Sequence, residues 1–386
     1  MLLSRTDRSY FSQWWWTVDR MVLLACIILM VVGLVLSLAA SPAVAIRLDM
    51  SDEMYFVKKQ MQFMPVALLL ILAISFITSE RLVRYIALAL FVGGMVLLIS
   101  GLLYGVKIKG SYRWVSLGFM TLQPSEFVKP GFVILSAWLF SQGMKYPKIR
   151  GNLLSFILFA SFISLLVLQP DMGQTMLVTA VWVAMFFLSG ASLWILAGFL
   201  GITGVGGFYA YNTMSHVAAR IDGFLNPADT DNYQVDLSLQ SFIQGGWFGK
   251  GPGESSIKSQ LPDAHTDFIF AVAGEEFGII GCLLIVAVFS FITFNFLRHA
   301  FSVENMFKKL SITGLTILFG MQAFINMGVN LKMLPAKGMT LPFISSGGSS
   351  LMSMAITVGL LLALTRRQPH ADQLPVGGRY NQPLQA

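Results

Sequence analysis

The sequence predicts an all-α, polytopic membrane protein with about ten transmembrane helices and a long extracytoplasmic loop between helices 7 and 8. Of its 386 residues, 55% are hydrophobic and only 12% are charged, and the mean hydropathy is +0.71. A soluble domain usually carries about 25% charged residues. Because so few polar side chains could not cover a surface in water, most of the exposed surface must face lipid, and a water-soluble fold is excluded.

Apolar runs without Asp, Glu, Lys or Arg locate the spans, since a transmembrane helix needs roughly 20 apolar residues. The runs are residues 21–40, 61–78, 85–106, 130–144, 151–170, 172–219, 277–297, 310–331 and 338–365. The run 172–219 is long enough for two helices with a turn near Ser189 and Gly190, which brings the number to ten. Together they form one membrane domain, residues 18–367.

The ends of the chain are expected in the cytoplasm, residues 1–17 as a short segment and residues 368–386 as a polar, disordered tail. An even number of spans puts both termini on one side, and a cytoplasmic placement puts the excess of Lys and Arg there, as the positive-inside rule requires. Residues 37–45 resemble a signal-peptidase site, but the apolar run before them is longer than the core of a signal peptide. A retained first helix is therefore expected, with the tryptophans at 14–16 as its interfacial belt.

Composition also argues against two kinds of site. The net charge is +7, but the 26 Lys and Arg are scattered between apolar runs, so no nucleic-acid partner is expected. Cys26 and Cys282 each lie inside an apolar run, where a thiol behaves as a small hydrophobe. No disulfide framework or zinc site is expected.

Three outer segments are richer in polar residues than a simple connection needs. The first, residues 107–129, carries four cations and one acid, and its Gln-Pro-Ser-Glu is expected to start a helix with Ser125 as the N-cap. It suits an anion site, or an interfacial loop whose Lys and Arg reach the lipid headgroups. Glu126 and Lys129 stand at i and i+3, so they could also pair with each other.

The second is the long loop, residues 212–266, which contains a Gly-rich stretch at 244–253. That stretch does not have the Gly-Lys-Ser/Thr of a phosphate-binding loop, and a flexible hinge is expected there. Asp267 follows the loop, where polar chain meets the apolar run that continues into the eighth span. A partly desolvated carboxylate at this boundary suits a general base, and the same residue could instead cap the helix.

The third is residues 330–350, with two prolines, three glycines and four serines at a membrane boundary. This composition predicts a re-entrant or broken helix, which is tolerated only where it lines a cavity or packs inside protein. A shorter signal, Gln169-Pro-Asp-Met-Gly-Gln174, puts Asp171 and Gln174 at an outer boundary. Asp171 could cap a helix there or contact a sugar.

Read in order, these segments resemble the SEDS family of polytopic peptidoglycan glycosyltransferases (shape, elongation, division and sporulation). The resemblance extends from about Trp16 to Arg367. Lys337, before Gly338, is typical of the cell-division branch, because the elongation branch usually has Thr there, and Ser346 departs from the Tyr that the family usually carries. The matching motifs are Arg113-Trp, Gln123-Pro-Ser-Glu-Phe-Val-Lys129, Gln169-Pro-Asp-Met-Gly-Gln174, residues 261–278 and residues 334–350.

The resemblance implies a ten-helix bundle in the bacterial cytoplasmic (inner) membrane that polymerises lipid II, the undecaprenyl-pyrophosphate-linked disaccharide pentapeptide, during septal cell-wall synthesis. The family's catalytic aspartate falls on Asp267. The cognate class B penicillin-binding transpeptidase (FtsI-like) and other membrane proteins of the division machinery are the implied partners. The residues expected to bind substrate are Arg113, Lys129, Lys337, Glu126, His265, Asp171, Gln174 and Ser349.

The chemistry that this function requires suits the sequence. A sugar hydroxyl of one lipid II must attack the anomeric carbon of another, so one base is needed, while pyrophosphate leaves without a strong general acid. Positive charge at the leaving group could come from Arg113, Lys129 and Lys337. A divalent cation, Mg²⁺ or Mn²⁺, could assist, but no residues are assigned to a metal.

Two other functions stay open, a lipid II flippase and a non-catalytic scaffold of the division machinery. Transport sites lie near the middle of the membrane, whereas Asp267, Arg113 and Lys337 map to its outer boundary, which favours extracytoplasmic chemistry. A scaffold predicts that removal of the charge at Asp267 leaves function intact.

Overall fold

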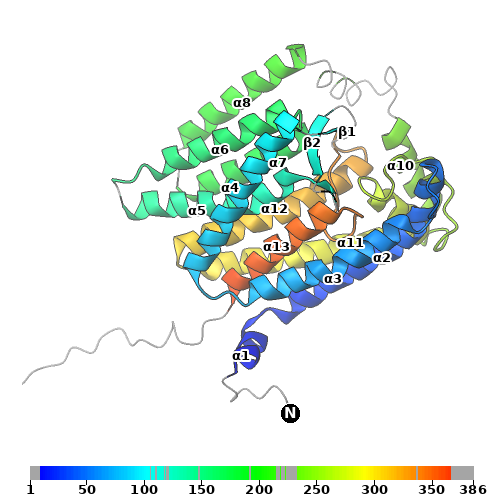
Figure 1. The fold of residues 1–386 in the computed structure, drawn as a ribbon, viewed down its shortest axis with the longest axis horizontal. Helices are drawn as coiled ribbons and strands as arrows, with labels where there is room; N and C mark the ends of the chain where they lie inside the picture. Colours follow the sequence, from blue (N-terminus) through cyan, green and yellow to red (C-terminus); the bar gives the residue numbers. More distant parts are fainter. Residues whose placement is uncertain are drawn as a thin grey trace, which may run out of the picture.

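The computed structural model describes residues 9–366 except residues 105, 109–110, 117, 119–120, 147, 191–192, 214–217, 219–221, 223–232 and 336–337. The long helices lie side by side, with the strands and α10 gathered at one end, which we call the sheet end (Figure 1). We call the other end, which carries Lys145 and Arg366, the far end. The elements are α1 (Tyr10–Thr17), α2 (Arg20–Arg47), α3 (Tyr55–Ser75), α4 (Glu80–Tyr104), β1 (Val106–Ile108), β2 (Ser111–Ser116), β3 (Thr121–Leu122), α5 (Pro124–Lys145), α6 (Gly151–Leu168), α7 (Met172–Leu188), α8 (Leu193–Thr213), α10 (Tyr233–Gly245), the 3₁₀ helix η1 (Ile257–Ser259), α11 (Ile269–Ser302), α12 (Met306–Asn330) and α13 (Gly348–Thr365).

The ten segments predicted as spans correspond in order to α2–α8 and α11–α13. Among the described residues, seven of these helices are long and apolar enough to cross a membrane, and α7 is a shorter apolar helix. The predicted all-α polytopic class is confirmed, and the chain is a multi-pass membrane protein. Helices α3, α5 and α11 begin before their apolar runs, so polar residues at the sheet end are helical as well.

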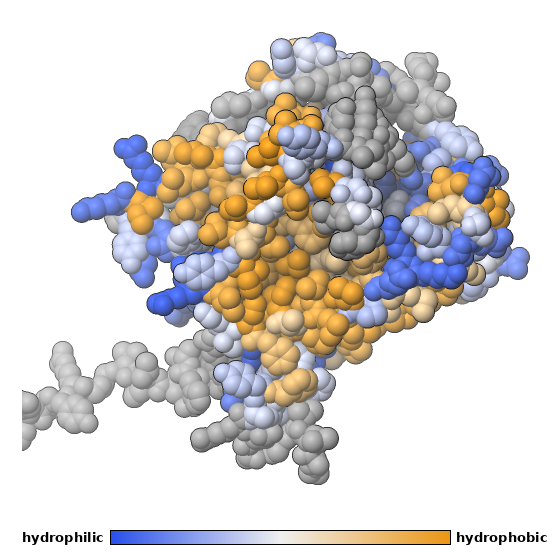
Figure 2. Space-filling model, viewed as in Figure 1, coloured by the Kyte–Doolittle hydropathy of each residue, from blue (hydrophilic) through white to orange (hydrophobic). Residues whose placement is uncertain are grey.

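Helices α5, α12 and α13 form the centre of the bundle. α12 packs against α5, α7, α11 and α13, while α13 also packs against α3 and α5. Most residues of α12 and α13 are buried, whereas fewer than a third of those in α3, α4 and α6 are. Figure 2 shows a broad apolar surface over the sides of the helices, with hydrophilic residues gathered toward the ends. This is the distribution that a protein embedded in lipid requires.

Helix α1 lies against the far end of the bundle, where only part of the predicted tryptophan belt is on the surface. Trp14 is buried, stacks on Phe76 with 4.7 Å between ring centroids, and donates a hydrogen bond from Nε1 to Ser75 Oγ (2.9 Å). Nearby, Arg366 Nε donates to Thr17 Oγ1 (3.0 Å). The first and last described helices therefore meet at the far end.

A small antiparallel sheet, β1-β2-β3, covers the sheet end between α4 and α5, and the sequence analysis did not predict it. The predicted N-cap of α5 was wrong: Gln123 caps the helix and Pro124 occupies its first turn, so Ser125 lies inside. The reason is the proline, which holds the residue before it in an extended conformation and fits the first turn of a helix.

The Gly-rich part of the long loop is packed into α11 and is not the predicted flexible hinge. Helix α11 breaks at Gly278 (φ +66°). The turn from Gly246 to Gly251 bonds to both sides of this break: Ile279 N donates to Gly246 O (2.9 Å) and Gly251 N donates to Glu276 O (3.1 Å). A Cβ at Gly249 would lie 2.0 Å from Glu276 O, so no larger residue fits there.

The two acids of α11, Glu275 and Glu276, bond to the same loop. Glu275 Oε1 accepts from Lys250 Nζ (3.0 Å) and from the backbone N–H of Ser256 (2.9 Å). Glu276 Oε1 accepts from Lys258 Nζ (3.0 Å). Both carboxylates are buried, so they hold the loop to the helix. The rest of the long loop, most of residues 214–232, lies outside the described residues, as does the predicted tail 368–386.

Candidate functional site

Asp267 lies in a turn at the sheet end, directly before α11. The carbonyl of Asp263 (φ +54°) accepts the backbone N–H groups of Thr266 and Asp267, both at 3.0 Å, which closes the turn. The N-cap position of α11 is Phe268, whose side chain makes no capping hydrogen bond. The half-buried Asp267 lies one residue before this position.

The Asp267 carboxylate faces the chain at Gly338. A Cβ built at Gly338 would lie 3.3 Å from Asp267 Oδ2, and Gly338 has a φ of +58°. Lys337, the neighbouring residue that the sequence analysis proposed for substrate binding, lies outside the described residues.

The predicted break in the helix at residues 330–350 is present: α12 ends at Asn330, α13 begins at Gly348, and the described residues between them are irregular, with 341–345 buried inside the protein. This irregular chain is bonded to the Asp267 turn. Ser345 Oγ donates to Thr266 O (2.6 Å) and Ser346 N donates to His265 O (2.9 Å). The buried His265 ring also packs against Phe56 of α3, 4.0 Å between centroids. His265 and Asp267 thus belong to one cluster.

A second cluster lies inside the bundle around Lys129, whose side chain has no exposed surface. Lys129 Nζ donates to Glu126 Oε1 (3.0 Å), Gln174 Oε1 (2.9 Å) and Gln322 Oε1 (2.8 Å). Gln174 Nε2 donates to Glu126 Oε1 (2.7 Å). The pairing of Glu126 with Lys129 that the sequence left open is present, and two amides complete it.

Arg113 and Asp171 form a third contact, at the edge of this cluster. Their nearest charged atoms are 3.7 Å apart, and the Arg113 guanidinium also donates to the carbonyls of Gln169 (3.3 Å) and Pro170. Asp171 is the N-cap of α7, because its Oδ1 accepts from the backbone N–H of Gln174 (3.4 Å). Burial raises the pKa of the Asp171 carboxyl, and the guanidinium opposes this only in part.

Ser349 joins α13 to the start of α5, since its Oγ accepts the backbone N–H of Gln123 (3.1 Å). One turn later, Ser353 Oγ donates to Glu126 O (2.6 Å). The small residues of α13 therefore hold the helix that carries Glu126 and Lys129, as small side chains in membrane helices commonly do.

Three amides that were not predicted from the sequence connect these clusters. Gln322, Asn326 and Asn330 stand at i, i+4 and i+8 on α12, and all are buried. Gln322 Nε2 donates to Thr340 O (3.2 Å) while its Oε1 receives Lys129. Three polar residues at helical spacing within the otherwise apolar run 310–331 were the signal that could have revealed them.

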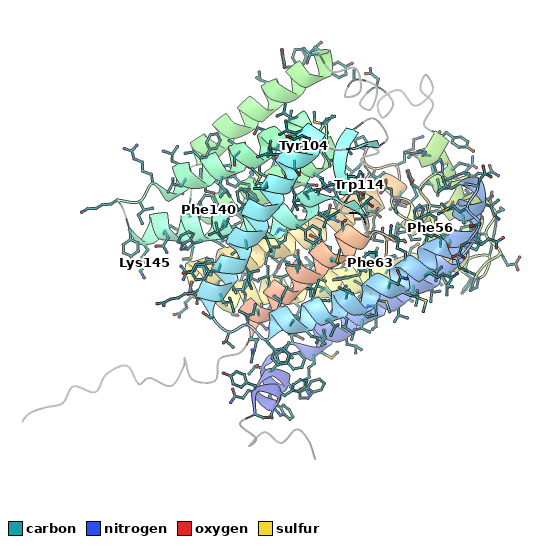
Figure 3. The ribbon with its side chains drawn as sticks, viewed as in Figure 1. Phe56, Phe63, Tyr104, Trp114, Phe140 and Lys145 are labelled. Atoms are coloured by element: carbon teal, nitrogen blue, oxygen red, sulfur yellow. The ribbon has the colours of Figure 1, made fainter. Side chains whose placement is uncertain are left out.

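The site offers a carboxylate at the surface of the sheet end and a buried polar network behind it. Figure 3 shows Phe56 and Trp114 toward this end of the bundle and Lys145 at the opposite end. Within the described ranges, no three His, Cys, Asp or Glu side chains come together as metal ligands would.

Comparison with known proteins identifies a family whose members are similar to this chain over most of its length. A family profile described as "Cell cycle protein", covering FtsW, RodA and SpoVE, matches residues 19–370. A relative from Caulobacter vibrioides, named probable peptidoglycan glycosyltransferase FtsW, is 40% identical over 370 residues, 95% of this chain and 94% of the relative. One of the same name from Pasteurella multocida is 33% identical and covers 90% of each chain.

Solved structures show the same fold. A chain from "Structural coordination of polymerization and crosslinking by a peptidoglycan synthase complex" superposes with a TM-score of 0.74 at 23% identity and covers 90% of this chain and 97% of its own. The Rod shape determining protein RodA of Thermus thermophilus superposes with a TM-score of 0.67 at 23% identity, with 91% and 97% covered.

Proposed function

This chain belongs to the FtsW, RodA and SpoVE family of cell cycle proteins, and on that premise we propose that it is a peptidoglycan glycosyltransferase that polymerises lipid II into glycan strands. Its FtsW relatives are named probable peptidoglycan glycosyltransferases, and the matches cover 95% and 90% of this chain. These relatives favour the cell-division branch, and therefore a role in septal wall synthesis.

The observation that carries the proposal is the placement of Asp267. Its carboxylate is half-buried at the sheet end, in a turn closed by main-chain hydrogen bonds and opposite Gly338. A general base needs to be reachable by the substrate and partly removed from water. We assign Asp267 to take the proton from the attacking sugar hydroxyl.

The reaction balances with one carboxylate. The deprotonated hydroxyl oxygen of one lipid II forms a bond to the anomeric carbon of another, the bond from that carbon to the pyrophosphate oxygen breaks, and the proton stays on Asp267. Direct attack on an α-linked donor gives inversion and a β-linked glycan. Pyrophosphate carries away the electron pair as an anion, so cations near it are required.

We assign Arg113 and Lys337 to the pyrophosphate and give Lys129 a different role. Lys129 is wholly enclosed by Glu126, Gln174 and Gln322, so it holds the interior of the site and does not contact the leaving group. Ser349 likewise positions α5 through Gln123. His265 lies next to the base along the chain and contributes to the wall of the substrate site.

The same proposal covers topology and partners. We propose that the sheet end faces outward and that both termini lie in the cytoplasm of a bacterial inner membrane. A class B penicillin-binding transpeptidase is the proposed partner. It is supported by the fold shared with a chain from a peptidoglycan synthase complex.

The test uses the purified protein in lipid vesicles, alone and with its transpeptidase. Lipid II is supplied, glycan products are resolved on a gel, and movement of labelled lipid II across the bilayer is followed in parallel. Polymer formation is expected. Movement of lipid II without polymer would indicate a flippase. If the protein neither forms polymer nor moves lipid II under any partner condition, the scaffold function is supported.

A further inference from the structure

Helix α12 carries a row of three buried amides that we call the amide ladder: Gln322, Asn326 and Asn330. At a spacing of four residues they lie above one another on one face of the helix, rising toward the sheet end. A buried amide is costly unless it is hydrogen-bonded. The groups to which these amides bond therefore indicate what they do.

Asn326 joins the two chain segments that face each other across the site. Its Nδ2 donates to Asp267 O (2.8 Å) and to Met339 O (2.6 Å). Both acceptors are main-chain carbonyls, so only the N–H end of the amide can face them. One side chain thus ties the turn that carries the proposed base to the segment directly after Gly338.

Asn330, one helical turn after Asn326, also hydrogen-bonds to the Asp267 segment. Its Nδ2 donates to Asp267 O (3.0 Å), and its Oδ1 accepts the backbone N–H of Ala271 in the first turn of α11 (3.1 Å). Ser238 of α10 donates to the Asn330 carbonyl (2.8 Å). The carbonyl of Asp267 therefore receives two amide donors from α12.

Gln322 extends the ladder to the interior of the bundle. It accepts from Lys129 Nζ (2.8 Å) and donates to Thr340 O (3.2 Å), one residue beyond Met339. The ladder thus contacts the Lys129 cluster, the 338–340 chain, the Asp267 turn and the start of α11. All of these contacts come from a helix whose own surface is mostly buried.

We infer that the amide ladder sets the position of the Asp267 carboxylate relative to the 338–340 chain, and that Asn326 and Asn330 are positioning residues of the reaction. The inference rests on the proposed function. Both residues are buried and act on the base through its main chain, so they do not touch substrate. A displacement of a reacting group by about 1 Å can lower the rate on the order of 100-fold.

The first experiment is a kinetic comparison of Asn326→Leu, Asn330→Leu and the double variant with the wild type. Leu keeps the branching of Asn at Cγ but carries two larger methyl groups in place of the amide, so it cannot donate. Each single variant is expected to lower kcat for polymerisation about 10- to 100-fold with KM changed less than about twofold. Because both amides share the Asp267 carbonyl, the double variant should lose less than the product of the two single losses.

Asn295→Leu is the matched control, because Asn295 is a half-buried amide of α11 that lies toward the far end. It makes the same chemical change away from the ladder and is expected to keep kcat and KM. A kcat within twofold of wild type in folded Asn326→Leu, or an equal loss in Asn295→Leu, would overturn the inference.

A second readout is independent of activity. Hydrogen exchange is measured by mass spectrometry on the same full-length proteins in lipid nanodiscs. The amide of Ala271 should exchange faster in Asn330→Leu, and residues 338–341 should exchange faster in Asn326→Leu, with neither change in Asn295→Leu. If the wild type makes no polymer but the two variants still show these changes relative to it, the proposed function fails and the positioning contacts stand. Unchanged exchange in both ladder variants would overturn the inference.

Discussion

Lys129 and Asp267 differ in how exposed their side chains are, and this difference suggests different roles. Lys129 has no exposed surface and donates to three side-chain oxygens. Asp267 is half-buried at the end of the bundle. A group that exchanges a proton with a large lipid-linked substrate needs to be reachable, and a group that holds helices together does not. This difference supports the proposed role of Asp267 as the base and a structural role for Lys129.

Replacing Lys129 tests the structural role. Lys129→Met leaves the Glu126 carboxylate buried without its cation, which should cost about 3–5 kcal/mol of stability. The midpoint of thermal unfolding, followed by tryptophan fluorescence in detergent, should fall clearly. Lys58→Met is the control, because its pair with Asp52 is exposed and should contribute little. Equal midpoints for the two variants would contradict the structural role.

A second change separates loss of the ion pair from loss of packing. In Lys129→Met combined with Glu126→Gln, no uncompensated charge is left in the interior. This double variant should therefore recover part of the lost stability. A double variant that is less stable than Lys129→Met would show that the charge of Glu126 is satisfied by other groups.

At the scale of elements, the break in α11 is the feature that fixes the long loop. Gly278→Ala would place a Cβ about 2.5 Å from the Gly249 nitrogen, at a φ of +66° that residues other than glycine rarely adopt. The expected cost is at least about 1–3 kcal/mol, seen as a lower unfolding midpoint and as protease cleavage within 246–258. Gly204→Ala in α8 meets no atom within 4 Å and should leave both measurements unchanged. A normal midpoint for Gly278→Ala would contradict the packed-loop description.

The spans could be predicted because lipid imposes a length and a composition on each of them. The helix boundaries at the sheet end could not be predicted, because polar residues there are helical and bond to neighbours distant in sequence. Glu275 and Glu276, for example, bond to Lys250 and Lys258 of the loop. The packing of the Gly-rich loop depends on the break at Gly278, which no local pattern indicated.

Parts of the candidate site could likewise be predicted from the sequence, and other parts could not. The motif around Asp267 was specific enough to identify the proposed base, and the pairing of Glu126 with Lys129 followed from their spacing. The amide ladder was missed because its residues stand in an apolar run and act on Asp267 from 59 residues away. Contacts between residues so far apart in the sequence cannot be predicted from a single sequence alone.

At the scale of the whole molecule, the two ends of the bundle differ in what they carry. The sheet end holds Asp267, Arg113 and α10, and the far end holds Lys145, α1 and the end of α13. The proposed topology places the sheet end outside the cell. Cys26 and Cys282 are buried, so single cysteines introduced on the surface can be labelled against a quiet background.

Labelling in whole cells tests this orientation. A cysteine at Phe248, which is exposed in the turn beside α11, should react with a membrane-impermeant maleimide in cells whose outer barrier has been opened. A cysteine at Lys145 should react only after the inner membrane is permeabilised. The reverse pattern would place the site in the cytoplasm and contradict the proposed reaction with an outward-facing substrate.

The central claim is that Asp267 is the base of a lipid II polymerase, and the most direct measurement is polymerisation by purified Asp267→Asn. Asparagine keeps the size of the side chain but cannot accept the proton at neutral pH. Asp236→Asn, the same change at an aspartate of α10 that pairs with Lys332, serves as the control. The account predicts polymer from the wild type and the control, and a rate lower by about 10²- to 10⁴-fold from folded Asp267→Asn. Polymer formed at the wild-type rate by Asp267→Asn would contradict it.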